Sequence, residues 1–258
     1  MSSIDTRQGS VQHPRRVAVV VETDNPRLIK ESKNILQHIK TTTQPGGVTL
    51  RFGERGVELH SSNQTHKKGQ RVDFLPIVHG VRTLSKKQPL PKAIGPYTSV
   101  VDATAGFGMD ACRLALLGFN VTAIEQSPIV SAMLRDGIWR AMENSTAKKL
   151  LQDNLRFVES NAIDYMNNHS PDVIYIDPMF PPKKKKSALP PGHIQMLQAV
   201  VGFDDVEATS SLFQTALRSA TKRIVVKRPT EAPCTGENPI ALYKSKLVRY
   251  EVYAPFSK

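Results

Sequence analysis

The chain has 258 residues, enough for one large α/β domain or for a catalytic domain with a smaller appendage. Its 35 Lys and Arg against 23 Asp and Glu give a net charge of +12, which favours an anionic partner such as nucleic acid without choosing RNA or DNA. Cys112 and Cys234 lack metal-site or disulfide-framework spacing, so we expect reduced thiols and no metal. The chain shows neither a signal-like start nor an apolar run of about 20 residues, which predicts a soluble, cytoplasmic protein without membrane contact.

The first part of the chain predicts a small α+β domain. Apolar and alternating runs there have strand lengths, and glycines between two of the runs favour a hairpin turn. Glycine and proline in Ala93-Ile94-Gly95-Pro96 then mark a boundary, which divides the chain into domains 1–94 and 95–258. The expected elements of the first domain are a strand at 17–21, a helix at 26–39 and a hairpin formed by 48–52 and 57–60.

From residue 95 onward, strand-like runs alternate with helix-like segments. This alternation is typical of an α/β domain with a doubly wound, mostly parallel sheet. We expect Trp139 to pack against that sheet. The expected strands are 99–101, 121–124, 155–158, 173–176, 223–226 and 247–253, and the expected helices are 110–117, 128 to beyond 139, 162–166 and about 205–220.

A glycine-containing loop follows the first strand of the second domain, with Asp102 at its start and Gly106 and Gly108 inside it. Glycines there let the backbone approach a nucleotide-like ligand at the start of the next helix. The spacing also satisfies the weak dinucleotide fingerprint, so a nicotinamide-dependent oxidoreductase stays open. Asp102 disfavours that alternative, because its carboxylate would repel a pyrophosphate but suits the two cationic groups of S-adenosylmethionine (SAM).

Polar residues also follow the next two strands. Glu125 comes roughly twenty residues after Gly106, where an acid can accept hydrogen bonds from both ribose hydroxyls, or it caps the following helix. Ser160 and Asn161 can contact an adenine edge or cap the helix expected at 162–166. The same cleft would also be lined by Met109 and Gln126.

The segment Asp177-Pro178-Met179-Phe180-Pro181 directly follows a probable buried strand. It offers an acceptor for amine N–H groups, a stiffened turn and a flat aromatic face, which together favour methyl transfer to a nucleobase amine. Asp177 and the Pro178 carbonyl would hold the amine, and Phe180 would stack on a base that is single-stranded, looped or flipped. The alternative is that Asp177 caps a turn and Phe180 belongs to the core.

Two basic stretches lie near this segment. The run Lys183, Lys184, Lys185 and Lys186 can hold RNA phosphates, or it forms a solvated loop. Lys227 and Arg228 end another expected parallel strand at the same sheet edge, where they can grip a phosphate or form ion pairs.

Three stretches carry a family resemblance: the loop Asp102–Asp110, the segment from Asp177 to its basic tail ending Ser187-Ala188-Leu189, and Val225–Pro229. On these residues the chain resembles the bacterial ribosomal RNA small-subunit methyltransferase J family, convincingly from about Ser99 onward. The resemblance implies a class I, Rossmann-like, SAM-dependent enzyme that methylates the N2 amine of one guanine in 16S ribosomal RNA. Its partner would be free 16S RNA or the small ribosomal subunit, and its product S-adenosylhomocysteine.

By position, the resemblance places cofactor contacts on Met109, Asp110, Glu125, Gln126, Ser160, Asn161 and Asp177. Met109 and Gln126 stand where the family carries arginines, so we expect contacts there through the backbone. The stretch His79–Lys87 replaces a glycine-rich basic stretch of the family. A methyltransferase for adenine or cytosine amines is the main alternative, ahead of an oxidoreductase or a noncatalytic RNA-binding relative. The oligomeric state stays open, with a monomer slightly favoured.

Overall fold

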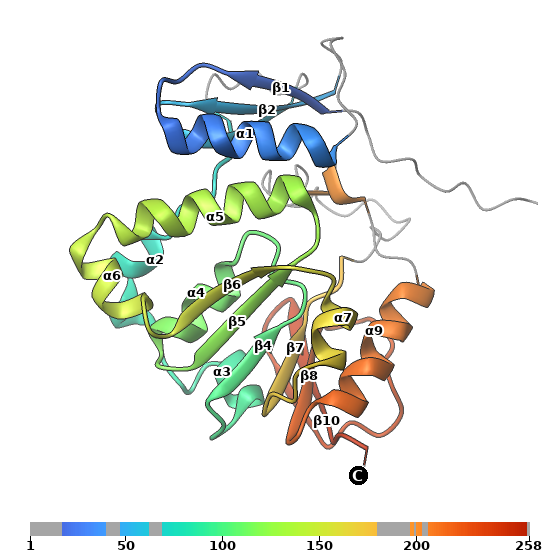
Figure 1. Ribbon diagram of the computed structural model, residues 1–258. Coiled ribbons are helices and arrows are strands. Elements are labelled where there is room, and N and C mark those ends of the chain that lie inside the picture. The colour runs from blue at the N-terminus through green and yellow to red at the C-terminus, as the bar shows by residue number, and fades with distance from the viewer. Residues whose placement is uncertain are drawn as a thin grey trace, which may run out of the picture.

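A computed structural model gives the fold, and the structure describes residues 17–39, 47–61, 69–179, 197–198, 200–202 and 206–256. The first of two sheets confirms the predicted strand, helix and hairpin of the N-terminal part (Figure 1). β1 pairs with β2 in parallel, and β2 pairs with β3 through the predicted antiparallel hairpin. The elements are β1 (Val17–Val21), α1 (Pro26–His38), β2 (Val48–Gly53) and β3 (Gly56–Ser61).

The second sheet has seven strands and confirms the predicted doubly wound, mostly parallel architecture. Its strands are β4 (Ser99–Asp102), β5 (Asn120–Glu125), β6 (Leu155–Glu159), β7 (Val173–Ile176), β8 (Arg223–Pro229), β9 (Ala241–Lys244) and β10 (Val248–Tyr253). They lie in the order β6-β5-β4-β7-β8-β10-β9. Neighbours from β6 to β8 are parallel, whereas β10 runs antiparallel to both β8 and β9.

Helices cover both faces of the large sheet (Figure 1). The two-residue period of β7 shows the division, because Val173 and Tyr175 belong to the core shared with α4 and α5, whereas Ile174 and Ile176 belong to the core shared with α9. The helices are α2 (Leu75–His79), η1 (Val81–Thr83), α3 (Pro89–Ile94), α4 (Met109–Leu116), α5 (Pro128–Met142), α6 (Ser145–Leu151), α7 (Ala162–Asn167) and α9 (Val206–Ser219).

α5 connects the small sheet to the large one (Figure 1). Its Asp136 is 0% exposed and accepts hydrogen bonds from Arg27 Nη2 at 2.6 Å, Arg140 Nε at 2.8 Å and the Val57 N–H at 3.0 Å. The expectation that Trp139 packs against the sheet is wrong. Trp139 is 39% exposed, and the Arg27 guanidinium lies 4.0 Å from its ring centroid, because this side of α5 faces α1.

The predicted boundary between residues 94 and 95 stays a prediction. One continuous apolar core contains Leu50 of the small sheet, Met133 of α5 and Val121 of the large sheet. In addition, α3 comes before the boundary but contacts β8, β9 and β10. In the described part of the chain, no helix has the length and apolar character needed to cross a membrane.

Candidate active site

The carboxyl ends of four neighbouring parallel strands bring the predicted site residues to one edge of the large sheet. Asp102 ends β4, Glu125 ends β5, Ser160 follows β6 and Asp177 follows β7. Open α/β sheets bind their ligands at this edge. The assignment of these residues to a cofactor stays a prediction, but the fold places them together.

The loop between β4 and α4 needs glycine for its backbone conformation. Gly106 and Gly108 have φ angles of 53° and 72°, in the left-handed region that side chains disfavour. A Cβ atom on Gly108 would also lie 2.7 Å from Leu134 Cδ1, so the backbone there packs too closely for any side chain. Conformation and packing therefore both require glycine here, and the Gly106 and Gly108 N–H groups donate to Glu125 Oε2 and the Ala105 carbonyl oxygen.

Glu125 links this loop to the next strand. Its Oε2 accepts a hydrogen bond from the Gly106 N–H at 3.1 Å, and its Oε1 accepts one from the Ser127 N–H at 2.7 Å. Ser127 is the N-cap residue of α5. The carboxylate thus lies between the glycine loop and the start of α5. The capping alternative is wrong, because Ser127 itself caps α5 through its Oγ, which accepts the Val130 N–H, and the ribose contact of Glu125 stays a prediction.

Asn161 occupies the capping position that the sequence offered as one alternative. Its Oδ1 accepts hydrogen bonds from the N–H groups of Ile163 at 2.8 Å and Asp164 at 3.4 Å, at the start of α7. Its Nδ2 donates to Gln126 Oε1 at 3.0 Å, which joins the ends of β5 and β6. Contact of Ser160 or Asn161 with an adenine stays a prediction.

Asp177 is held from two sides. Its backbone N–H donates to Thr104 Oγ1 at 2.6 Å, and its Oδ2 pairs with Lys227 Nζ at 2.8 Å. The same Nζ donates to Asp110 Oδ2 at 3.0 Å, and Asp110 Oδ2 also accepts the Tyr175 hydroxyl at 2.9 Å. Lys227 therefore bridges the start of α4 and the end of β7, and we call Asp110, Asp177 and Lys227 the lysine bridge.

The charges of this cluster shift the pKa values of its members. Burial raises the pKa of Asp102 well above its usual range, and the nearby Asp110 raises it further. Burial alone would raise the pKa of Asp110, but the charge and hydrogen bond of Lys227 outweigh burial and lower it. Burial would likewise lower the pKa of Lys227, but the two acids raise it. Lys227 and Asp110 therefore stay ionised near neutral pH.

For Lys227, the structure shows the ion pair that the sequence left open beside a phosphate contact. Arg228 Nε and Nη2 donate to the Pro233 carbonyl oxygen at 3.2 Å and 2.9 Å, so this side chain supports the loop after β8. Phosphate binding by either residue stays a prediction. Phe180 and the run Lys183–Lys186 lie outside the described residues, whereas Pro178 is described and buried.

Sequence reasoning missed the contributions of Thr104 and Tyr175. Tyr175 lies within an apolar strand, and the only available signal was its hydroxyl, which needs a partner when buried. Thr104 carried no signal, because its contact depends on how closely the β4 loop approaches β7.

The acidic residues at this edge fit SAM in charge. The carboxylate of Glu125 and the partly exposed carboxylate of Asp177 suit a cationic ligand better than a pyrophosphate. Among the residues that the structure describes, no group of three or more His, Cys, Asp or Glu side chains is placed to hold a metal ion.

Comparisons with known proteins agree with this fit. A family model of SAM-dependent methyltransferases matches residues 32–255. The chain is 34% identical to a ribosomal RNA small subunit methyltransferase J from Pseudomonas fluorescens, over 94% of this chain and 97% of that protein. It is 43% identical to a protein of the same name from Psychromonas ingrahamii, over 65% of this chain and 67% of that protein. The solved structure of a SAM-dependent methyltransferase from Neisseria gonorrhoeae matches with a TM-score of 0.72 and 28% identity, over 93% and 97% of the two chains.

Proposed function

Because the chain belongs to the ribosomal RNA small subunit methyltransferase J family of SAM-dependent methyltransferases, we propose that it methylates the N2 amine of a guanine in 16S ribosomal RNA. The observation that carries the proposal is the placement of Asp177. It lies at the ligand-binding edge beside the glycine loop, is fixed by Thr104 and Lys227, and keeps 37% of its side chain exposed. A carboxylate in this position can accept hydrogen bonds from an amine that enters from outside.

The guanine N2 amine is a weak nucleophile, because its lone pair is delocalised into the ring. Bound SAM supplies an electrophilic methyl group, so the main task of the chain is to orient the amine in line with that group. In this mechanism Asp177 accepts one amine N–H, and the Pro178 carbonyl oxygen accepts the other. As the new N–C bond forms, the bond between the methyl carbon and sulfur breaks, S-adenosylhomocysteine is the leaving group, and the nitrogen loses a proton to solvent.

Lys227 and Thr104 position the acceptor in this mechanism. Lys227 holds one carboxylate oxygen of Asp177, while Thr104 holds its backbone N–H, so the side chain is restrained before the RNA arrives. Such preorganisation lowers the cost of ordering the acceptor in the transition state. The base must leave its stack to reach this edge, so its RNA partner is a loop, a single strand or a flipped nucleotide.

The direct test is product analysis. Purified protein is incubated with labelled SAM and either free 16S RNA or small ribosomal subunits, both prepared from a strain that lacks the enzyme. The RNA is then digested to nucleosides. We expect the label in N2-methylguanosine in at least one of the two preparations. Label in methylated adenine or cytosine amines, or transfer to neither preparation, would overturn the proposed specificity.

A further inference from the structure

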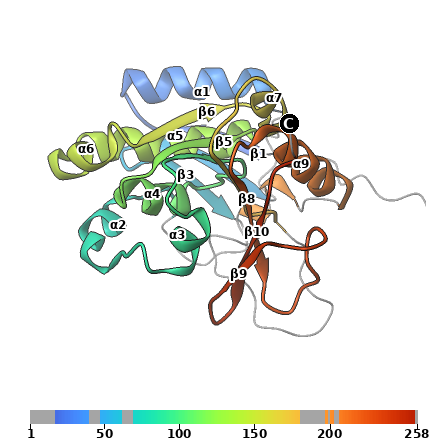
Figure 2. The same ribbon diagram turned by 90° about the horizontal axis from the view of Figure 1, so that it is seen from below.

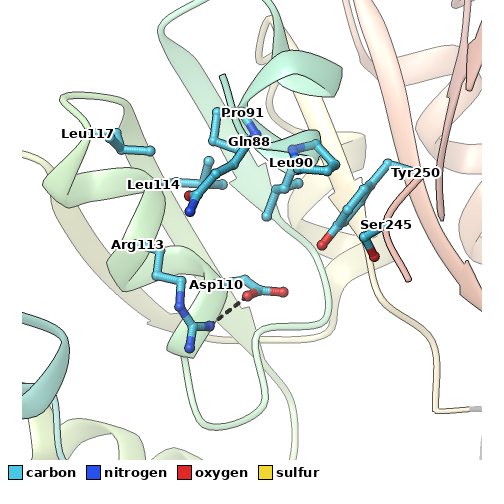
Figure 3. A pocket seen from close by; sticks show the side chains of 10 residues that line it. Gln88, Leu90, Pro91, Asp110, Arg113, Leu114, Leu117, Ser245 and Tyr250 are labelled. Atoms are coloured by element: carbon cyan, nitrogen blue, oxygen red, sulfur yellow. Dashed lines mark hydrogen bonds and ion pairs between the residues drawn. The ribbon is translucent and has the colours of Figure 1, made fainter. Parts of the chain in front are cut away.

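A pocket lies beside the proposed catalytic edge, between α3, α4 and the β9–β10 hairpin (Figure 3). Its volume is about 270 Å³, close to the lower end of the roughly 300–1,000 Å³ usual for small-molecule sites. That size suits one nucleotide base better than a whole dinucleotide cofactor. Three elements contribute its walls, including Gln88 and Leu90 at α3, Arg113 and Leu114 of α4, and Ser245 and Tyr250 of the β9–β10 hairpin.

The lining combines apolar walls with groups that can read the edge of a base. Leu117 offers apolar surface in front of the buried Leu90 and Leu114, whereas Gln88, Arg113 and Tyr250 carry hydrogen-bonding groups that lie around the pocket (Figure 3). Burial raises the pKa of Tyr250 to about 12, so its hydroxyl stays a donor at neutral pH. A planar ring with polar edges matches this combination.

Exposed lysines adjoin two lining residues of the pocket in the sequence, and we call them the rim lysines. Lys86 and Lys87 directly precede Gln88, and Lys244 and Lys246 flank Ser245. Lys86 Nζ also lies 5.0 Å from the ring centroid of Phe119, near the end of α4. α3 contacts β9 and β10, so these two segments, which are distant in sequence, lie side by side (Figure 2).

The pocket is connected to the lysine bridge through Asp110. Asp110 lines the pocket, while its Oδ2 pairs with Lys227, which in turn holds Asp177. Its Oδ1 pairs with Arg113 at 2.9 Å, so its charge is balanced by two cations (Figure 3). A chain of nucleotides that presents one base to Asp177 therefore passes close to this pocket.

We infer that this pocket holds a nucleotide next to the target in the RNA strand, with its base between α3 and α4 and its phosphates against the four rim lysines. The inference rests on the proposed function, because it adds a second contact site for the same RNA. The site would fix the register of the strand, so that one guanine rather than a neighbour reaches Asp177.

The rim is tested with two double variants, Lys86→Gln with Lys87→Gln, and Lys244→Gln with Lys246→Gln. The matched control is Lys148→Gln with Lys149→Gln, which removes the same charge from exposed adjacent positions on α6. Binding of a 16S RNA transcript is measured by anisotropy between about 50 and 200 mM salt. We expect each rim pair to weaken binding about tenfold at low salt and to reduce the salt slope by about 1 to 2, while the control leaves the slope unchanged. An equal loss in the control would overturn the inference in favour of diffuse charge attraction.

The pocket itself is tested by filling it from two walls, with Leu117→Trp and separately Ser245→Trp. Each variant should bind the transcript about tenfold more weakly with an unchanged salt slope, because it blocks a base and leaves the phosphate contacts. Thermal melting shows whether either variant is misfolded, which matters for Ser245 because its Oγ donates to the Val248 carbonyl oxygen and accepts the Val248 N–H in the β9–β10 turn. Normal RNA binding by both folded variants would overturn the inference.

A parallel measurement of SAM affinity separates two sources of failure. If the filled variants lose SAM binding and keep RNA binding, the pocket belongs to the cofactor and the inference is wrong. RNA binding is read without methyl transfer, so a product other than N2-methylguanosine would defeat the proposed function and leave this inference intact.

Discussion

Two parts of the molecule hold an aspartate against basic side chains, and they differ in exposure. Asp136, between the small sheet and α5, is 0% exposed and receives two arginines and a backbone N–H. Asp177, at the edge of the large sheet, is 37% exposed and shares one lysine with Asp110. The first carboxylate is enclosed by donors from three segments, whereas the second remains accessible from outside.

The difference in exposure indicates that Asp136 contributes mainly to stability and Asp177 mainly to the proposed chemistry. A buried carboxylate that is surrounded by donors contributes to folding, because removing it leaves several polar groups without a partner. A partly exposed carboxylate that is held by a shared cation contributes less to folding but is ready to meet a ligand. Variants of the two aspartates and of their partners should therefore differ in whether they affect turnover or stability.

The largest effect is expected for Asp177→Ala. Loss of the acceptor should lower kcat by about 10²- to 10³-fold, the scale of one removed transition-state contact. SAM affinity should stay within about tenfold, or about 1.4 kcal/mol. Labelled methyl transfer measures kcat, and equilibrium dialysis measures SAM affinity.

Asp172→Ala is the matched control, because Asp172 lies before β7, at the opposite edge of the sheet, and should leave kcat unchanged. Wild-type turnover in Asp177→Ala would remove Asp177 from the mechanism.

Asp136→Ala should have the opposite profile. It leaves Arg27, Arg140 and the Val57 N–H without their common acceptor, and we expect the free energy of unfolding to fall by about 3 kcal/mol. Urea denaturation measures the change, with the exposed Asp153→Ala as a control expected within about 0.5 kcal/mol. If folded Asp136→Ala lost as much turnover as Asp177→Ala, the proposed division between the two regions would be wrong.

Lys227→Met tests whether the shared cation acts mainly on chemistry. We expect kcat to fall about tenfold, or about 1.4 kcal/mol, with partial recovery in Lys227→Arg. Lys222→Met, an exposed lysine just before β8, is the control. A normal kcat in Lys227→Met would show that Asp177 does not depend on this cation.

The same variant has a predicted pH dependence. The folded-state pKa of Asp110 is lowered, because the effects of Lys227 and Tyr175 outweigh burial. These two contacts therefore stabilise the folded protein at pH values above the usual aspartate pKa of about 3.9. This stabilisation is lost as pH falls through the lowered folded-state pKa. The difference in unfolding free energy between wild type and Lys227→Met should therefore be constant near neutral pH and shrink below about pH 4. A difference that grows on acidification would contradict the assignment.

The smallest effect is expected for Asp102→Asn. Burial raises the folded-state pKa of Asp102, and the charge of Asp110 raises it further. Because the unfolded-state pKa is about 3.9, the folded protein loses stability as pH rises from about 3.9 through the raised folded-state pKa. Asparagine keeps an acceptor for the Thr104 N–H without the charge. At neutral pH we expect a gain of about 1 kcal/mol, or about 2–4 °C in Tm, that disappears near pH 4. Thermal melts at two pH values check it, and a gain that does not vary with pH would contradict it.

Much of the fold was predictable because apolar periodicity is local. The β7 run and the glycine loop carry their own patterns, and they placed Asp177 and Asp102 correctly at the carboxyl edge of the sheet. β9 was missed because it is a four-residue strand at the sheet edge with alternating exposed positions. α6 was missed because it begins three residues after α5 ends, although Asn144 supplies a capping signal.

The details of the site were less predictable, because they depend on pairings between strands. The lysine bridge requires β8 to lie beside β7, and only then does Lys227 reach Asp177. Trp139 was misplaced for a related reason. The helical pattern assumed one covered face, but α5 lies between two sheets, so its apolar and aromatic residues are divided between two sides.

The position of β10 has a consequence for synthesis of the protein. β10 comes last among the described strands, yet it lies between β8 and β9, and its Arg249 donates to the Ala232 carbonyl in the loop after β8. β8, which carries Lys227, therefore pairs with β10 only after residues 248–253 have left the exit tunnel of the translating ribosome. A nascent chain that stalls before Val248 would expose the edge of β8, which makes it a target for chaperones and proteases rather than a working enzyme.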